Sequence, residues 1–350
     1  MALLGSALAK AAKVVPRPII QRIAYRYVAG ETLEEALSKV SELNAMGCSA
    51  TVDLLGEGIT DTTSVPATVA QYKRLLSALA SKGLEAGISV KLTALGLGLD
   101  DALCRSTLED IVDHAAKHRH FVRVDMEDHR YTQATLDMVL DVHRSHTNVG
   151  VVIQAYLRRS LRDIERLVAE KVSVRLCKGI YNEPRHLAYK DFDLVRANYL
   201  LLLEELLRGG CYVGIATHDE YLVWHVLRLL RELGRPRDSY EFQMLLGVDE
   251  ELRTMLVEAG HRLRVYVPYG KDWYAYSMRR LNENPKMAGY IAKGLFRPTR
   301  RRQAQPAPGP AVASPVGQPG GDGFGASEAG GEEAPQAANA QELSVVMSVT

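Results

Sequence analysis

The sequence has little of several features that mark common protein classes. Its four cysteines, among 350 residues, form no CxxC pair and no spacing typical of metal ligands. No uncharged apolar run reaches the roughly 18 residues that a membrane-spanning helix needs. Lys and Arg total 43 against 42 Asp and Glu, so the basic excess of a nucleic-acid binder is missing. These absences predict a cytoplasmic-type protein with reduced thiols that binds neither a metal nor nucleic acid.

Three sequence motifs of common enzymes are also missing. The chain has no HExxH and no GxSxG, so metal-dependent and serine hydrolysis are poorly supported. The first apolar run ends in LLGEGITD, which differs from the G-x-G-x-x-G turn of dinucleotide-binding sheets. The chemistry must therefore come from residues that lie far apart in the sequence.

Charge and composition change near both ends of the chain. Beyond Arg302 there are five acids and no Lys or Arg, and the segment is rich in Gly, Pro and Ala. It has too little apolar surface to offset its ordering entropy, which predicts a disordered tail over 299–350. The first 30 residues hold five bases and no acid. We expect a helical N-terminal extension over 1–44, with peripheral membrane attachment or a targeting peptide as alternatives.

Residues 45–298 alternate between two sequence patterns, one typical of strands and one typical of helices. Eight short β-branched or apolar runs predict strands at 49–56, 87–96, 121–128, 149–156, 172–179, 212–219, 240–247 and 264–270. Between them, apolar residues at three- and four-residue spacing predict helices at 67–83, 131–145, 158–170, 194–210, 221–233 and 249–260. Eight alternating units predict an α/β fold of the (β/α)8 TIM-barrel type, and an open doubly wound sheet is the alternative.

Polar residues interrupt the predicted strands mainly near their carboxyl ends, where a barrel places its active site. They are Asp53, Glu57, Lys91, Thr93, Asp125, Glu127, Gln154, Arg175, Lys178, Thr217, His218, Gln243, Tyr266 and Tyr269. The Lys and Arg among them, together with Arg279 and Arg280, favour an anionic substrate or a phosphorylated cofactor. Lys91 is also compatible with Schiff-base chemistry in a lyase or aldolase. A further alternative is that the protein is a non-catalytic binding scaffold.

The motifs at these strand ends resemble one family. DLLGE, SVKLTALG, VRVDMED, QAYLRRS, RLCKGIY, IATHD, YEFQMLLGV and YVPYGKDWYAYSMRRLNEN occur in order between about residues 30 and 297. The chain thereby resembles the proline dehydrogenases, in their short, single-function bacterial form. The resemblance implies a flavoprotein that oxidises L-proline to 1-pyrroline-5-carboxylate, the first step of proline catabolism, or that prefers hydroxyproline.

The resemblance also implies roles for individual residues. It places the substrate carboxylate at Lys91, Arg279 and Arg280, and Glu57 pairs with Arg279 as a gate. Catalytic positions fall at Asp125, Arg175 and Tyr266, while Tyr181 and Leu245 shape the substrate pocket. Flavin contacts, besides Arg175, fall at Met126, Gln154, Lys178, Gly179, Ile180, Thr217 and His218.

Cofactor and partners follow from the same resemblance. We expect FAD held without a covalent bond, because no His or Cys lies in an evident attachment context. The protein would position the substrate carbon against the flavin and tune it electrostatically, and a cation such as Arg175 would stabilise the reduced ring. The implied electron acceptor is a membrane quinone, reached from the cytoplasm by peripheral contact with the inner face of the membrane.

Overall fold

Eight parallel strands form a closed barrel in the part of the chain that the structure describes. The structure is a computed structural model that describes residues 24–56, 58–274, 276 and 277. Each strand pairs with the next, and the first pairs with the last. The strands are β1 (Ser49–Leu54), β2 (Ala86–Val90), β3 (Val122–Val124), β4 (Val149–Gln154), β5 (Ser173–Cys177), β6 (Val213–Ala216), β7 (Tyr240–Leu245) and β8 (Leu263–Tyr269). The predicted TIM-type fold is confirmed, with every strand inside or within one residue of its predicted run.

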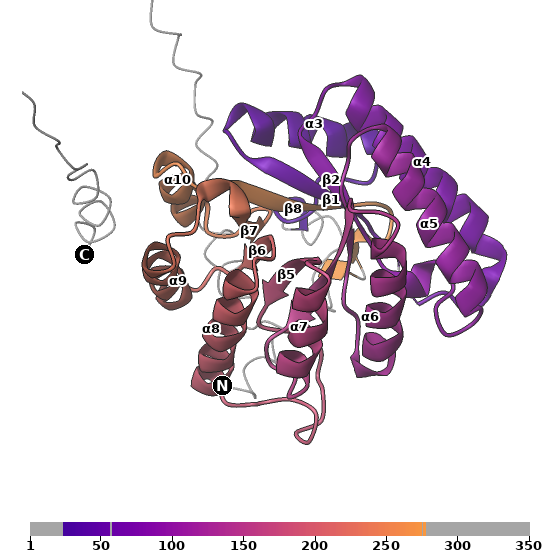
Figure 1. The fold of residues 1–350 in the computed structure, drawn as a ribbon. Helices are drawn as coiled ribbons and strands as arrows, with labels where there is room; N and C mark the ends of the chain where they lie inside the picture. The colour runs from indigo at the N-terminus through magenta and orange to yellow at the C-terminus, as the bar shows by residue number, and fades with distance from the viewer. Residues whose placement is uncertain (1–23, 57, 275, 278–350) are drawn as a thin grey trace, which may run out of the picture. The chain divides into compact units, whose positions relative to one another are not determined.

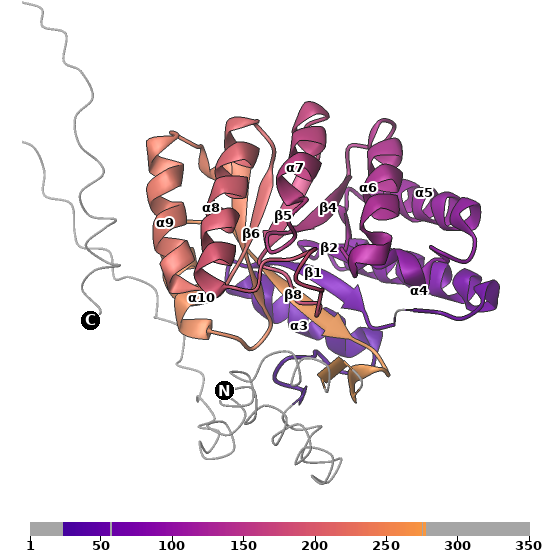
Figure 2. The same cartoon turned by 90° about the horizontal axis from the view of Figure 1, so that it is seen from below.

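Helices surround the barrel and follow its strands in turn (Figures 1 and 2). The helices in the described residues are α3 (Leu33–Ala45), α4 (Val65–Ser81), α5 (Asp101–Lys117), α6 (His129–His143), α7 (Ser160–Ala169), α8 (Phe192–Arg208), α9 (Glu220–Glu232) and α10 (Glu250–Glu258). Short 3-10 turns occur at Thr62–Ser64, Leu92–Ala94 and Arg237–Ser239. Over the described ranges, none of these helices is both long enough and apolar enough to cross a membrane.

Helix α5 is absent from the predicted segments, although its pattern is present in the sequence. Cys104, Leu108, Ile111 and Ala115 repeat at three- and four-residue spacing and are all buried against the barrel. The expected tail lies outside the described residues, as do the first 23 residues of the expected N-terminal extension. The proposed domain boundaries therefore stay predictions.

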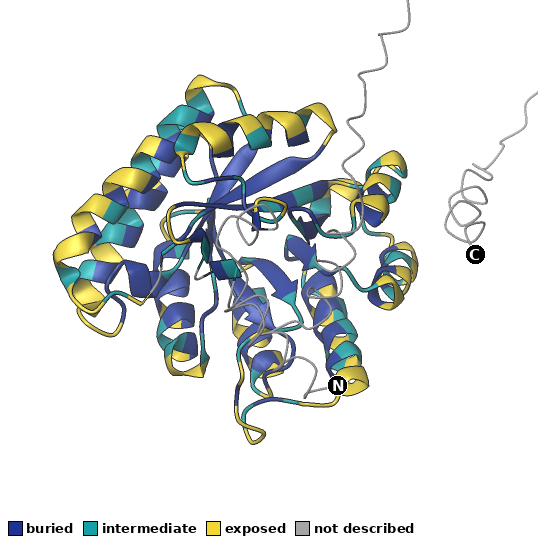
Figure 3. Ribbon diagram, turned by 180° about the vertical axis from the view of Figure 1, so that it is seen from behind, coloured by how far each residue is buried: buried dark blue, intermediate teal, exposed yellow. Residues whose placement is uncertain are grey.

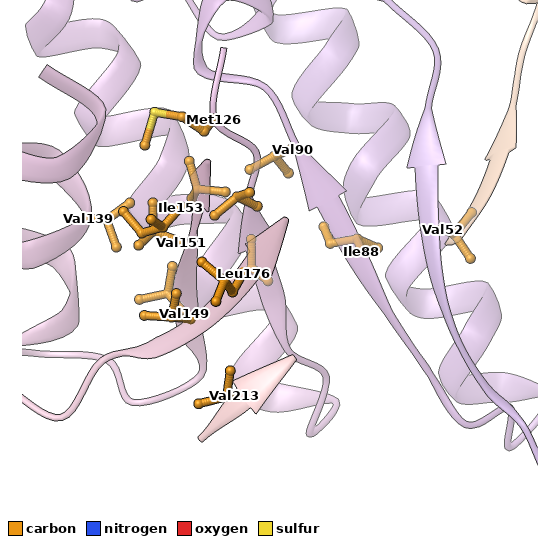
Figure 4. Packing of buried hydrophobic residues seen from close by; sticks show 14 of the residues in the cluster. Val52, Ile88, Val90, Met126, Val139, Val149, Val151, Ile153, Leu176 and Val213 are labelled. Atoms are coloured by element: carbon orange, nitrogen blue, oxygen red, sulfur yellow. The ribbon is translucent and has the colours of Figure 1, made fainter. Parts of the chain in front are cut away.

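The main apolar core lies between the barrel and its helices. Alternate strand residues such as Val90, Val151 and Leu176 point outward and pack in one cluster with helix residues such as Val139 of α6 (Figure 4). The helices bury the side that faces the strands and expose the other (Figure 3). This double layer lets the strands be buried on both faces, as a parallel sheet requires.

The inside of the barrel is unusually polar. Such interiors are normally filled by branched apolar side chains, yet Arg123, Arg175 and Glu241 lie there and are at most 7 % exposed. Strand glycines make room for these long side chains. A Cβ at Gly150 would lie 2.3 Å from the Ser173 carbonyl oxygen and 2.7 Å from Nη1 of Arg123. The fold therefore carries charged groups from the barrel floor to its mouth.

Candidate active site

A cavity of about 280 Å³ opens at the carboxyl ends of the strands. Thirteen of the predicted site residues line it, and these are Lys91, Asp125, Met126, Gln154, Arg175, Lys178, Gly179, Ile180, Tyr181, Thr217, His218, Leu245 and Tyr266. The remaining three, Glu57, Arg279 and Arg280, lie outside the described residues. Segments separated by up to 175 residues in sequence thus meet in one cavity because each follows a strand of the same barrel.

Asp125 is the centre of the charged network in this cavity. Its Oδ1 accepts hydrogen bonds from Ser89 Oγ at 2.6 Å and from Arg175 Nη1 at 2.9 Å. Its Oδ2 accepts from the Tyr266 hydroxyl at 2.9 Å and lies 3.5 Å from Lys91 Nζ. One carboxylate therefore orients two cations and a phenol that come from three different strands.

These contacts set the protonation states of the network. Burial raises the pKa of Asp125, but attraction from Lys91 and Arg175 outweighs burial and holds that pKa below its usual value. Burial also opposes a charge on Lys91, yet the nearby carboxylates, Asp53 first, raise its pKa well above the usual value. The cavity thus presents cations beside an ionised carboxylate at neutral pH.

The charge on Lys91 disfavours the lyase alternative. Lys91 Nζ lies 2.7 Å from Oδ1 of Asp53, whose side chain is fully buried. Schiff-base formation needs a neutral amine, which active sites create by lowering the pKa of a lysine. Here the surrounding charges act in the opposite direction and favour the protonated amine of Lys91.

One wall of the cavity offers polar groups suited to a planar cofactor. The Leu245 amide donates to His218 Nε2 at 2.9 Å, so the proton of the neutral ring is on Nδ1. That Nδ1 is buried and has no hydrogen-bond partner among the described residues. Burial lowers the pKa of His218 to about 4, which keeps the ring neutral. A buried donor beside the cavity fits an acceptor atom of a bound ligand, such as a flavin.

The loop after β5 completes this wall. Gln154 Oε1 accepts from the Ile180 amide at 3.3 Å, and its Nε2 donates to the Glu127 carbonyl at 3.1 Å. Gly179 has a φ of +111°, and a Cβ there would lie 2.1 Å from the Tyr156 ring. The glycine therefore allows both the backbone turn and its close approach to Tyr156.

Lys178 is held at the rim of the cavity. Its Nζ lies 2.9 Å from Oδ2 of Asp219, which also binds Arg196 at 2.7 Å. Although burial raises the pKa of Asp219, hydrogen bonds from Arg196 and Lys178 bring it down to about 2. Thr217 Oγ1 accepts from the Asp219 amide at 3.1 Å, which ties its side chain to the start of α9.

The structure adds three residues to those that have a predicted role in the site. Asp53 and Gln243 stand out in the sequence as polar residues within apolar strands, and they contact Lys91 and Arg175 respectively. Ser89 gives little signal in the sequence, because its side chain is small and uncharged. Only its hydrogen bond to Asp125 shows that it belongs to the site.

Comparison with known proteins identifies the family. The model of the proline dehydrogenase family matches residues 36–293. Proline dehydrogenase 1 of Bacillus subtilis subsp. natto is 36% identical over 274 residues, which are 78% of this chain and 91% of that protein. The proline dehydrogenase of Deinococcus radiodurans is 36% identical over 282 residues, 79% of this chain and 90% of that protein.

A solved structure shows the same fold within a longer chain. It is the crystal structure of proline utilization A (PutA) from Bdellovibrio bacteriovorus inactivated by N-propargylglycine, with a TM-score of 0.72 and 25% identity. The match covers 78% of this chain and 34% of the other, so this chain spans about a third of that protein's length. Taken with the family match over most of the barrel, these similarities show that the chain belongs to the proline dehydrogenase family, a family of flavin-dependent oxidoreductases.

Proposed function

We propose that this chain oxidises L-proline to 1-pyrroline-5-carboxylate with a non-covalently bound FAD, and that its electrons pass to a membrane quinone. The observation that carries the proposal is the convergence of Lys91, Asp125, Arg175 and Tyr266 on one cavity beside the unpaired Nδ1 of His218. When bound, the flavin would supply the redox chemistry by taking up a hydride from the substrate. The residues of the chain bind, orient and electrostatically stabilise the reacting groups.

The charge of the barrel interior suits a small carboxylate. Among the described side chains there, four cations (Lys91, Arg123, Arg175 and Arg264) face three carboxylates (Asp53, Asp125 and Glu241). An ammonium has three donors, and Asp53 accepts from that of Lys91 at 2.7 Å. Lys91 can therefore also donate to the proline carboxylate. We propose that Arg279 and Arg280 complete this carboxylate site and that Glu57 pairs with Arg279 to close it.

The proposed flavin site occupies the other side of the cavity. The cofactor would be held by Met126, Gln154, the run from Lys178 to Ile180, Thr217 and His218, and Arg175 would lie close to the flavin. A guanidinium there stabilises negative charge that develops during the reaction. Tyr181, Leu245 and Tyr266 would bound the pocket around the proline ring. His218 Nδ1 would donate to the cofactor, which gives that buried proton its partner.

Absorbance spectroscopy tests the proposal directly. The purified protein should be yellow, and L-proline added without oxygen should bleach the flavin bands. Denaturation followed by filtration should release all of the colour, and colour kept on the chain would contradict non-covalent binding. A protein with no flavin spectrum, or one that proline does not bleach, would contradict the proposed activity. The same assay with hydroxyproline measures the substrate preference.

A variant of Asp125 extends this test. Asp125→Asn should slow bleaching at least roughly tenfold, because it releases Lys91 and Arg175 from their positions. Asp137→Asn is the matched control, since this half-exposed carboxylate of α6 pairs only at the surface.

Reoxidation of the bleached protein by a quinone in lipid vesicles tests the proposed electron acceptor. We propose peripheral contact with the inner face of the membrane through the basic N-terminal residues, which vesicle co-sedimentation measures.

A further inference from the structure

A line of hydrogen bonds runs from the barrel floor to Arg175. Arg264 Nε donates to Glu241 Oε1 at 2.7 Å, and Gln243 Nε2 donates to the same oxygen at 2.6 Å. Gln243 Oε1 then accepts from Arg175 Nε at 2.5 Å. The Tyr212 hydroxyl donates to the second Glu241 oxygen at 3.0 Å. A buried carboxylate and a buried amide therefore connect one arginine with another across three strands.

The chemistry of the end groups determines the direction of the amide. A guanidinium only donates, so the Gln243 oxygen must face Arg175. An ionised carboxylate only accepts, so the Gln243 NH₂ must face Glu241. Glu241 is held ionised because, although burial raises its pKa, Arg264 and the surrounding hydrogen bonds lower it below the usual value. The amide has a single favourable orientation between its two charged neighbours.

A glycine makes room for this amide. Gly214 of β6 is paired with Glu241 of β7, and a Cβ at position 214 would lie 2.4 Å from Gln243 Nε2 and 2.8 Å from its Cδ. Gly214 does not line the active-site cavity, and neither does Glu241. Gln243 lies next to both residues and does line the cavity, so it connects them with the site.

We propose that Glu241 and Gln243 are positioning residues that hold the Arg175 guanidinium in the orientation needed for catalysis. Gly214, which has no Cβ, leaves the room that the Gln243 amide needs. In that orientation Arg175 Nη1 donates to Asp125 Oδ1 at 2.9 Å and the guanidinium carbon lies 5.2 Å from the centre of the Tyr266 ring. Without Gln243, Nε loses its acceptor and the guanidinium can turn about its terminal bonds. The inference rests on the proposed function, in which Arg175 stabilises charge at the reacting centre.

The test uses Gly214→Ala, which displaces the Gln243 side chain although position 214 itself does not line the cavity. We expect kcat for proline to fall roughly tenfold to hundredfold, as misplacement of a catalytic group does, while KM changes less than threefold. The reduction potential of the bound flavin should fall, because a turned Arg175 stabilises the reduced form less. Gln243→Ala should show the same changes. Gly214→Ala added to Gln243→Ala should have little further effect, since the clash is gone.

One control and one substitute variant separate positioning from loss of stability. Ser173→Ala removes a half-buried hydrogen bond that Arg123 Nη2 makes to Ser173 Oγ in the barrel, outside the Arg175 contacts. This variant should keep kcat and the flavin potential of the wild type. If Gly214→Ala does not fold, Gln243→Met decides instead, because it keeps the side-chain length and loses both polar ends.

The outcomes distinguish the inference from the proposed function. A wild-type protein that proline does not reduce refutes the proposed function and this inference with it. An active wild type whose Gly214→Ala or Gln243→Met variant folds and keeps both kcat and flavin potential refutes the inference alone. Additive effects in the double variant would also overturn it, because the glycine would then act independently of Gln243.

Discussion

At the scale of single residues, neighbouring groups set the chemistry of the cavity more than residue type does. Asp53 and Asp125 both contact Lys91, yet burial raises the pKa of Asp53 while the pKa of Asp125 lies below its usual value. The difference arises because Asp125 also accepts from Arg175 and Ser89, whereas the negative charge of Asp125 raises the pKa of Asp53 further. Sequence alone treats the two aspartates as equivalent strand-end acids.

His218 provides a prediction at this scale. Its pKa is about 4 in the folded protein against an ordinary 6.5, so folding favours the neutral ring. The associated stability is present above pH 6.5 and is lost as the pH falls toward 4, by at most about 3 kcal/mol. Chemical denaturation of the protein across this range should show the loss. His218→Gln should lack this part of the decline, whereas the exposed control His186→Gln should keep it. Equal slopes for the wild type and His218→Gln would contradict a neutral buried ring.

At the scale of elements, the loops that carry the site end in aspartate caps. Asp100, Asp128, Asp191 and Asp249 each accept a backbone N–H in the first turn of the helix that follows. The predicted segments start helix α6 at 131 and α8 at 194, two residues late in each case. The first two residues of each helix are exposed, so the buried apolar periodicity begins after them and the pattern alone misses them.

Asp191 allows this capping to be measured. It lies at the end of the loop that carries Lys178 and Tyr181, and its Oδ1 accepts from the Leu194 amide at 2.9 Å. Asp191→Ala should lower the free energy of unfolding by about 1 kcal/mol in urea denaturation. Glu205→Ala removes an exposed acid from the last turn of the same helix, far from the cap, and should change the free energy of unfolding by less than about 0.5 kcal/mol. Equal losses in the two variants would show that charge, not capping, is responsible.

At the scale of the whole molecule, closure of the barrel assembles the site. Pairing of β1 with β8 brings Asp53 to the same strand level as Pro268, two residues beyond Tyr266. Lys91, Asp125, Arg175 and Tyr266 then face one another from four strands. The composition of 303–350 predicts that this segment adds little to the barrel.

Deletion of 303–350 tests that prediction. We expect the melting temperature to change by less than about 2 °C and proline turnover to stay near the wild-type value, because the segment has few large apolar residues. A loss of several degrees corresponds to roughly 1 kcal/mol or more for a domain of this size. Calorimetry showing such a loss would mean that the segment packs on the barrel.

The sequence by itself determined the barrel, the order of its strands and thirteen residues that line its cavity. The barrel and the polar residues at its mouth follow from local patterns, because apolar periodicity places the elements and a parallel barrel gathers all carboxyl strand ends at one mouth. Five of the lining residues, Met126, Gly179, Ile180, Tyr181 and Leu245, are implied by the family resemblance instead. Tertiary structure alone decided which groups pair. Tyr266 and Asp125 are 141 residues apart, Arg175 and Gln243 are 68 apart, and nothing local relates them. Hydrogen bonds depend on strand register and on which side chains point inward at the same level, and the space that Gly214 leaves for Gln243 exists only after the barrel has closed.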